Sequence, residues 1–191
     1  MIEIVRKRVE ESISVKQKIL ADESLLETLV DISVQIVSTL NKGGKVIFAG
    51  NGGSFADSIH LAAEFVSRFQ KEREALAAIA LGANNSTLTA IGNDYSFEEV
   101  FSRELEALAG ADDLFIAIST SGNSKNILRA VQSAERKGIV TYCLTGEGGG
   151  ELASLTRTIE MPATKTARIQ EGHILVGHII CELAENAFTE G

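Results

Sequence analysis

The sequence predicts an α/β fold: a doubly wound, mostly parallel five-stranded sheet flanked by helices, with an N-terminal helical extension. Short apolar runs typical of buried strands alternate with longer segments of helical periodicity. Two of these runs, 45–49 and 114–118, lead into glycine-rich or hydroxyl-rich turns and then into helices. The length of 191 residues and the 45% hydrophobic content suit one domain over 1–191, with helices in 1–41 and an α/β core with its C-terminal helix in 42–191.

Two helices are predicted in the N-terminal 41 residues, and Asp22 or Ser24 is the candidate cap of the second. The second helix is apolar on more than one face, which is typical of a helix buried on several sides. Packing against the chain's own sheet and packing against another subunit explain this pattern equally well.

The strands and helices of the core then alternate. The predicted strands are 45–49, 77–81, 114–118, 139–144 and an edge strand at 156–161. The predicted helices follow the turn 50–54, begin at the caps 84–86, cover 96–108, start near Ser124 and run from about Thr166 to Phe188. A polar turn is predicted at 92–95, where the sequence is Gly-Asn-Asp-Tyr.

The turn 119–124 (Ser-Thr-Ser-Gly-Asn-Ser) lies at the carboxyl end of a predicted strand, where open α/β sheets bind ligands. The helix that follows offers unpaired N–H groups and the positive end of its dipole. A simple capping turn is the alternative, but a cap needs only one hydroxyl. Four hydroxyls in six residues therefore predict a phosphate site.

A second turn, 50–54 (Gly-Asn-Gly-Gly-Ser), also joins a predicted strand to a helix. It is not a Walker loop, because no Gly-Lys-Ser/Thr ends it. It is also a poor dinucleotide fingerprint, because Phe55 stands where the third glycine would fall. Two such turns in one small α/β chain strengthen the prediction of a phosphorylated ligand.

Charge and cysteine usage limit the partners and the compartment. A net charge of −8 argues against nucleic acid or an anionic membrane as the main partner. Cys143 and Cys181 stand alone in apolar contexts, which suits a reducing compartment. Residues 6–8 (Arg-Lys-Arg) interrupt the N-terminal apolar positions, and no apolar run approaches the ~20 residues of a membrane span. We therefore expect a cytoplasmic protein without a signal peptide.

Titratable groups are concentrated in two helical segments. His60 and Glu64 are four residues apart and share a helix face, as two metal ligands, an acid/base pair or a surface salt link would. The last helix carries Gln170, His173 and His178 among apolar residues, where polar groups cost free energy unless they are paired. For His173 we predict a satisfied core histidine without a direct role.

Five motifs occur along the chain in this order: GNGGS, H-x-x-x-E, GNDY, ISTSGNS and ARIQEGH-x4-H. In combination they resemble the phosphoheptose isomerases of the sugar-isomerase (SIS) fold family. The similarity covers nearly the whole chain. It implies an aldose–ketose isomerase that converts sedoheptulose 7-phosphate to D-glycero-D-manno-heptose 7-phosphate through an enediol(ate). It also implies a role in heptose biosynthesis for lipopolysaccharide core or surface polysaccharide, a homotetramer, and one zinc ion per subunit.

The resemblance also implies the site residues. Glu64 matches the catalytic base and His178 the catalytic acid. The implied zinc ligands are His60, Glu64, Gln170 and His178. The implied substrate contacts are Asn51, Gly52, Gly53, Ser54, Glu64, Arg68, Asn93, Asp94, Ser119, Thr120, Ser121, Ser124 and Gln170.

Two features of the implied zinc site each have more than one explanation. Gln170 and His178 are ~12 Å apart along one helix, so one metal holds both only through long reaches, a bent helix start or two subunits. Glu64 and His178 are assigned both to the metal and to proton transfer, so either the zinc mainly organises the site or its coordination changes when substrate binds.

The sequence departs from the family pattern at 82–86 (Gly-Ala-Asn-Asn-Ser), where relatives often have a Thr/Asp-rich turn, and at 165–167 (Lys-Thr-Ala), where some have an acidic residue. These departures affect the expected details of substrate binding, not the expected class of enzyme. The alternative function is a non-catalytic binding protein of the same fold, like the relatives that bridge replication initiator molecules. Those relatives lose the Glu/His pair, whereas this chain has Glu64 and His178.

Overall fold

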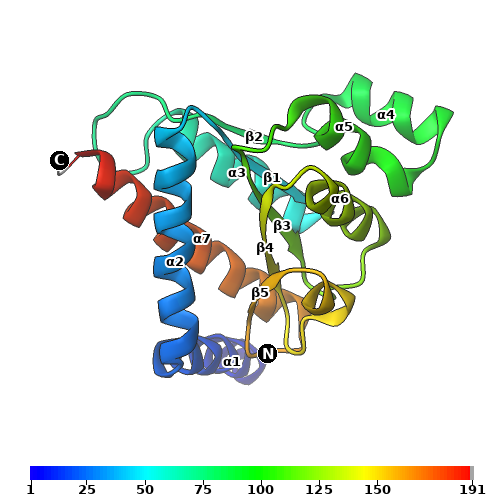
Figure 1. The fold of residues 1–191 in the computed structure, drawn as a ribbon. Helices are drawn as coiled ribbons and strands as arrows, with labels where there is room; N and C mark the ends of the chain where they lie inside the picture. The colour runs from blue at the N-terminus through cyan, green and yellow to red at the C-terminus, as the bar shows by residue number, and fades with distance from the viewer. Residues whose placement is uncertain (190–191) are drawn as a thin grey trace.

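The computed structural model describes residues 1–189 and confirms the parallel five-stranded sheet (Figure 1). Neighbouring strands are all parallel, in the order β2-β1-β3-β4-β5. The strands are β1 (Val46–Gly50), β2 (Ala78–Ala80), β3 (Leu114–Ser119), β4 (Val140–Thr145) and β5 (Arg157–Glu160). The predicted edge strand at 156–161 is therefore confirmed as β5.

The helices also follow the predicted order. They are α1 (Ile2–Ala21), α2 (Glu23–Asn41), α3 (Gly53–Val66), α4 (Asn85–Asp94), α5 (Val100–Leu108), α6 (Lys125–Arg136) and α7 (Thr166–Thr189), with 3-10 turns η1 (Phe97–Glu99) and η2 (Gly150–Ser154). The predicted cap is confirmed, because the Asp22 carboxylate accepts the N–H of Leu25 at 3.0 Å. The predicted polar turn at 92–95 is wrong: α4 continues through Asp94, and the N–H of Tyr95 still bonds the carbonyl of Ile91.

Helices cover both faces of the sheet, as a parallel sheet requires. Side chains alternate along β1, so Val46 and Phe48 join the core under α2, α3 and α7. Ile47 and Ala49 point to the opposite face and join the core under α5 and α6. Within residues 1–189, none of the helices combines the length and the apolar character that crossing a membrane requires.

The second N-terminal helix, α2, uses only part of its apolar surface inside the chain. Leu29, Ile32 and Ile36 are buried in the core that α2 shares with α7 and the sheet. Val30 and Val34 remain 53% and 58% exposed. Packing on the chain's own sheet thus explains one face of α2, and the subunit interface predicted for the other face stays a prediction.

The carboxyl ends of β1 and β3 lie side by side at one edge of the sheet. From β1 the chain crosses to β2 on one side, and from β3 it crosses to β4 on the other. This divergence is the topological switch point at which doubly wound sheets bind ligands. The turns 50–54 and 119–124 follow these two strands, so the fold brings both predicted ligand turns to that point.

Candidate active site

A reciprocal amide pair joins the two turns at the switch point. The Nδ2 of Asn51 donates to the Oδ1 of Asn126 at 2.8 Å, and the Nδ2 of Asn126 donates back to the Oδ1 of Asn51 at 2.9 Å. Asn126 is buried in the first turn of α6. Sequence reasoning missed Asn126, although its place two residues after the turn 119–124 was a usable signal.

In the turn 119–124, called here the phosphate turn, three serine hydroxyls bond within the turn rather than cap the helix. Ser119 Oγ donates to Ser124 Oγ at 3.1 Å, and Ser121 Oγ accepts the N–H of Asn123 at 3.2 Å. Ser124 is the N-cap residue of α6, yet its hydroxyl accepts no backbone N–H there. The capping alternative therefore does not describe Ser124, and the N–H groups of the first turn of α6 stay open to an anion.

The glycine-rich loop after β4 braces the phosphate turn. Gly122 has a φ of +66°, and a Cβ there would lie only 1.9 Å from the carbonyl oxygen of Gly149. The N–H of Gly146 donates to the carbonyl of Thr120 at 3.1 Å, and the N–H of Glu151 donates to Asn123 Oδ1 at 2.8 Å. This close packing explains why the turn needs glycine at 122.

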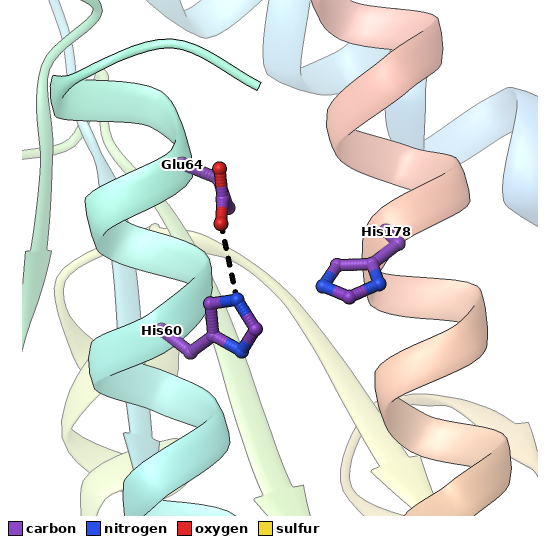
Figure 2. A group of neighbouring side chains, drawn as sticks. All are labelled: His60, Glu64 and His178. Carbon is purple, nitrogen blue, oxygen red and sulfur yellow. Dashed lines mark ion pairs between the residues drawn. The ribbon is translucent and has the colours of Figure 1, made fainter. Parts of the chain in front are cut away.

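His60, Glu64 and His178 form a cluster, here the His–Glu–His cluster, between α3 and α7 (Figure 2). His60 Nε2 lies 3.0 Å from Glu64 Oε1, and one ligand atom from each residue lies within 4.8 Å of the others. The His60 and His178 rings meet edge to face at 5.0 Å. The two helices approach closely because residue 177 is glycine: a Cβ there would lie 2.8 Å from the Leu61 methyl groups.

The donor set of the His–Glu–His cluster suits a zinc ion. Two imidazoles and one carboxylate are common ligands of a catalytic zinc, with further positions left open. His178 Nε2 is buried and has no hydrogen-bond partner among residues 1–189, as expected of a nitrogen aimed at a missing ligand. The residues present therefore fit the predicted metal.

Asp57 lies one turn before His60 on α3, and sequence reasoning missed it. Its Oδ2 is buried and unpaired within the described part of the chain. Burial raises the pKa of Asp57, while the positive charge that His60 and His178 can carry acts to lower it. Asp57 thus adds a partly buried acidic group beside the His–Glu–His cluster, and only its i, i+3 spacing to His60 could have signalled it.

Gln170, a residue of α7, packs against the N-terminal end of α3, far from Glu64. A Cβ on Gly53 would fall 2.3 Å from Gln170 Nε2, so the amide rests against the first residue of α3. His60 follows Gly53 by seven residues, which is about 10 Å along the helix. Within one subunit, Gln170 therefore lies with the turn 50–54, apart from the His–Glu–His cluster.

A family model of the SIS domain matches residues 10–146. The phosphoheptose isomerase of Aneurinibacillus thermoaerophilus is 47% identical over 188 residues, which cover 98% of this chain and 95% of that protein. The chain belongs to the phosphoheptose isomerase family. Two solved phosphoheptose isomerases share its fold: that of Neisseria gonorrhoeae (TM-score 0.89, 40% identity, coverage 96% of this chain and 98% of that one) and that of Francisella tularensis (0.92, 33%, 97% and 98%).

Three further residues predicted for this phosphoheptose isomerase site, Arg68, Asn93 and Asp94, lie on the surface of the subunit, whereas the predicted Ser54 is buried at the start of α3. Arg68 follows the end of α3, and its Nη1 donates to Glu72 Oε2 at 2.7 Å. Asn93 and Asp94 are exposed at the end of α4, where Asn93 Nδ2 donates to Asp94 Oδ1 at 2.8 Å. Figure 1 shows α4 well away from α7. One subunit therefore does not bring Asn93 and Asp94 to the His–Glu–His cluster.

His173 is confirmed as a core histidine, but it is only partly satisfied, because its Nδ1 is buried without a hydrogen-bond partner among residues 1–189. Its side chain is 0% exposed, and its Nε2 lies 3.0 Å from the carbonyl oxygen of Thr145. Burial lowers the pKa of His173 to about 4, against a smaller upward effect of that hydrogen bond. The ring is therefore neutral at pH 7, with Nε2 as the donor. This contact ties α7 to the end of β4.

Proposed function

We propose that this chain isomerises sedoheptulose 7-phosphate to D-glycero-D-manno-heptose 7-phosphate, in heptose biosynthesis for lipopolysaccharide core or surface polysaccharide. The observation that carries the proposal is the His–Glu–His cluster in a member of the phosphoheptose isomerase family. The alternative of a non-catalytic binding protein is not favoured, because this chain keeps Glu64 and His178 and brings them together.

Aldose–ketose isomerisation removes a proton from the carbon next to the carbonyl and returns a proton to the neighbouring carbon. A carboxylate is suited to the carbon-bound proton, so Glu64 removes it to form the enediol(ate) and later returns it. An imidazole is suited to moving a proton between the two oxygens, which is the role of His178. Both groups belong to one cluster in which one ligand atom from each residue lies within 4.8 Å of the others, so they can act on adjacent atoms of one substrate.

One zinc ion per subunit belongs to the proposal, held by His60, Glu64 and His178 of one subunit, with Gln170 of a neighbouring subunit as the fourth ligand. Bound zinc supplies a Lewis acid that polarises a carbonyl oxygen and stabilises negative charge on it. The proton movements remain those of Glu64 and His178.

Distance supports a site that two subunits share. Glu64 follows Gly53 by eleven residues, so it lies ~16 Å along α3 from the end where the phosphate turn and Gln170 lie. From C1 to phosphorus, an extended seven-carbon sugar 7-phosphate has eight bonds and spans about 10 Å with C–C bonds of ~1.5 Å. We therefore assign the phosphate turn, with Ser119, Thr120, Ser121 and Ser124, to one subunit and the His–Glu–His cluster to its neighbour.

A homotetramer would also let more distant residues take part. Asn51, Gly52, Gly53, Ser54 and Gln170 would accompany the phosphate turn, and Arg68, Asn93 and Asp94 would complete the substrate contacts. The exposed apolar residues of α1 and α2 supply surface for such an assembly. We place the enzyme in the cytoplasm, because both of its cysteines are free and buried. The charge of −8 makes nucleic acid an unsuitable partner.

A coupled assay with sedoheptulose 7-phosphate tests the proposed function. Purified protein should turn the substrate over, a chelator should abolish the turnover, and added zinc should restore it. Metal analysis should find about one zinc per subunit before chelation and none after it. Absence of turnover with zinc present would contradict the proposed substrate, and full activity after complete zinc removal would leave His60, Glu64 and His178 without a required metal.

A further inference from the structure

We propose that Arg73 and Glu185 are positioning residues for the isomerase site. Their buried ion pair fixes the loop 67–73 after α3, and through it the backbone of Glu64 and the surroundings of His178. The inference rests on the proposed function for the roles of Glu64 and His178.

Glu185 on α7 fixes the backbone of the loop. Its Oε1 accepts the N–H of Phe69 at 2.8 Å, and its Oε2 accepts the N–H groups of Gln70 at 2.7 Å and Lys71 at 2.9 Å. Burial alone would raise the pKa of Glu185, but these N–H donors and the charge of Arg73 together lower it. The carboxylate is therefore ionised at neutral pH, and it holds three successive amides of a segment without regular secondary structure.

Arg73 caps the end of α3. Its Nε donates to Glu185 Oε1 at 3.1 Å, and the two side chains are only 4% and 1% exposed. Its Nη2 donates to the carbonyl of Glu64 at 2.7 Å, and its Nη1 donates to the carbonyl of Phe65 at 2.9 Å. The last carbonyls of a helix have no partner within the helix, so a guanidinium there both pairs them and complements the helix dipole.

The same loop reaches the other half of the cluster. The Phe69 ring lies against the His178 ring, with 5.3 Å between centroids and 36° between planes. Because Glu185 holds the N–H of Phe69, the ring contact depends on that carboxylate. Arg73 and Glu185 therefore connect the backbone of Glu64 to the ring face of His178, without being placed to contact substrate.

Stability alone is a weak explanation for this pair, because desolvation offsets much of the attraction in a buried ion pair. The chain offers a matched control with the same chemistry away from the site. Asp113 is also buried, accepts the N–H groups of Lys45 and Gly110 at 2.8 Å, and pairs with Lys45 Nζ at 2.7 Å. Within the described residues its carboxylate bonds Lys45 and Gly110, and neither of them belongs to α3, α7 or the loop 67–73.

The test compares Glu185→Gln with Asp113→Asn in the full-length, zinc-loaded protein. Amide hydrogen exchange at 69–71, the NMR signals of the His178 ring, and kcat and KM for sedoheptulose 7-phosphate are measured well below each unfolding midpoint. For Glu185→Gln we expect faster exchange at 69–71, shifted His178 signals and a kcat at least tenfold lower. For Asp113→Asn we expect lower stability, unchanged His178 signals and a kcat within twofold of wild type.

Two more variants keep the test decisive. Arg73→Lys retains the charge but loses the fork that reaches two carbonyls, so its kcat should also fall. Phe69→Leu keeps the backbone contacts with Glu185, so its amides should exchange as in wild type while the His178 signals shift and kcat falls at least threefold. These variants replace Glu185→Gln if that protein does not fold, and failure of all three to fold would overturn a positioning role.

The proposal is also overturned if the amides at 69–71 exchange faster in Glu185→Gln while kcat stays within twofold of wild type. It is likewise overturned if kcat falls as far in Asp113→Asn as in Glu185→Gln. Hydrogen exchange and the His178 signals require no turnover. If they respond as expected in a protein that does not isomerise sedoheptulose 7-phosphate, the proposed substrate is wrong and the structural coupling stands.

Discussion

Single hydroxyls of the phosphate turn should contribute mainly to substrate binding. Replacing Ser124 or Ser121 by Ala removes a donor to the phosphate, a loss of ~1–2 kcal/mol, or roughly a 5- to 30-fold rise in KM. Steady-state kinetics measure the change in KM. Thr28→Ala serves as a control, because within residues 1–189 the Thr28 hydroxyl bonds the α2 backbone at Ser24. An unchanged KM in both serine variants would remove the phosphate from this turn.

His173 gives a pH dependence of stability with a defined sign. Its pKa falls from 6.5 to about 4 on folding, so the unfolded chain binds more protons between these values. The contribution of neutral His173 to the free energy of unfolding is therefore complete above pH 6.5 and is lost as the pH falls toward 4. From pH 7 to pH 5, His173 should lower the free energy of unfolding by about 2 kcal/mol. Urea unfolding of wild type and His173→Gln measures this difference, and equal pH slopes in the two proteins would refute it.

At the scale of helices and strands, a substitution in the first turn of α3 tests whether Gln170 belongs to the active site. Ala at position 53 would displace the Gln170 amide, because the new Cβ would meet Nε2 at 2.3 Å. Ala also favours the helix by up to ~1 kcal/mol over Gly, so stability should not fall. We expect KM to rise at least threefold in Gly53→Ala.

Gly110→Ala is the matched control, because a Cβ there meets nothing within 4 Å. Its KM should equal that of wild type. A wild-type KM and zinc content in Gly53→Ala would place Gln170 outside the site.

The elements that sequence reasoning predicted well are those whose signal is local. The strands are apolar runs between turns, and the pair His60 and Glu64 needs only helical periodicity. The end of α4 was missed because Gly-Asn-Asp-Tyr has the composition of a turn, while backbone hydrogen bonding carries the helix through Asp94. The Arg73–Glu185 pair was missed because 112 residues separate its partners and neither lies in a distinctive motif.

For the whole molecule, the exposed apolar faces of α1 and α2 predict assembly. Light scattering at micromolar concentration should give a mass of about 80 kDa, four times the 20.4 kDa chain. Val34→Asp puts a charge on the exposed face of α2 and should lower the mass and the turnover together. A monomeric wild type with full activity would contradict both the tetramer and a site shared between subunits.

Exchange of solvent deuterium into the sugar tests the central claim most directly, namely that Glu64 transfers the carbon-bound proton. Wild type in deuterium oxide should label the carbon next to the carbonyl of sedoheptulose 7-phosphate, as NMR would detect. Glu64→Gln keeps the shape of the side chain but removes the base, so it should bind substrate and leave the carbon unlabelled, with kcat lowered roughly a hundredfold or more. Labelling by Glu64→Gln at the wild-type rate would contradict this assignment.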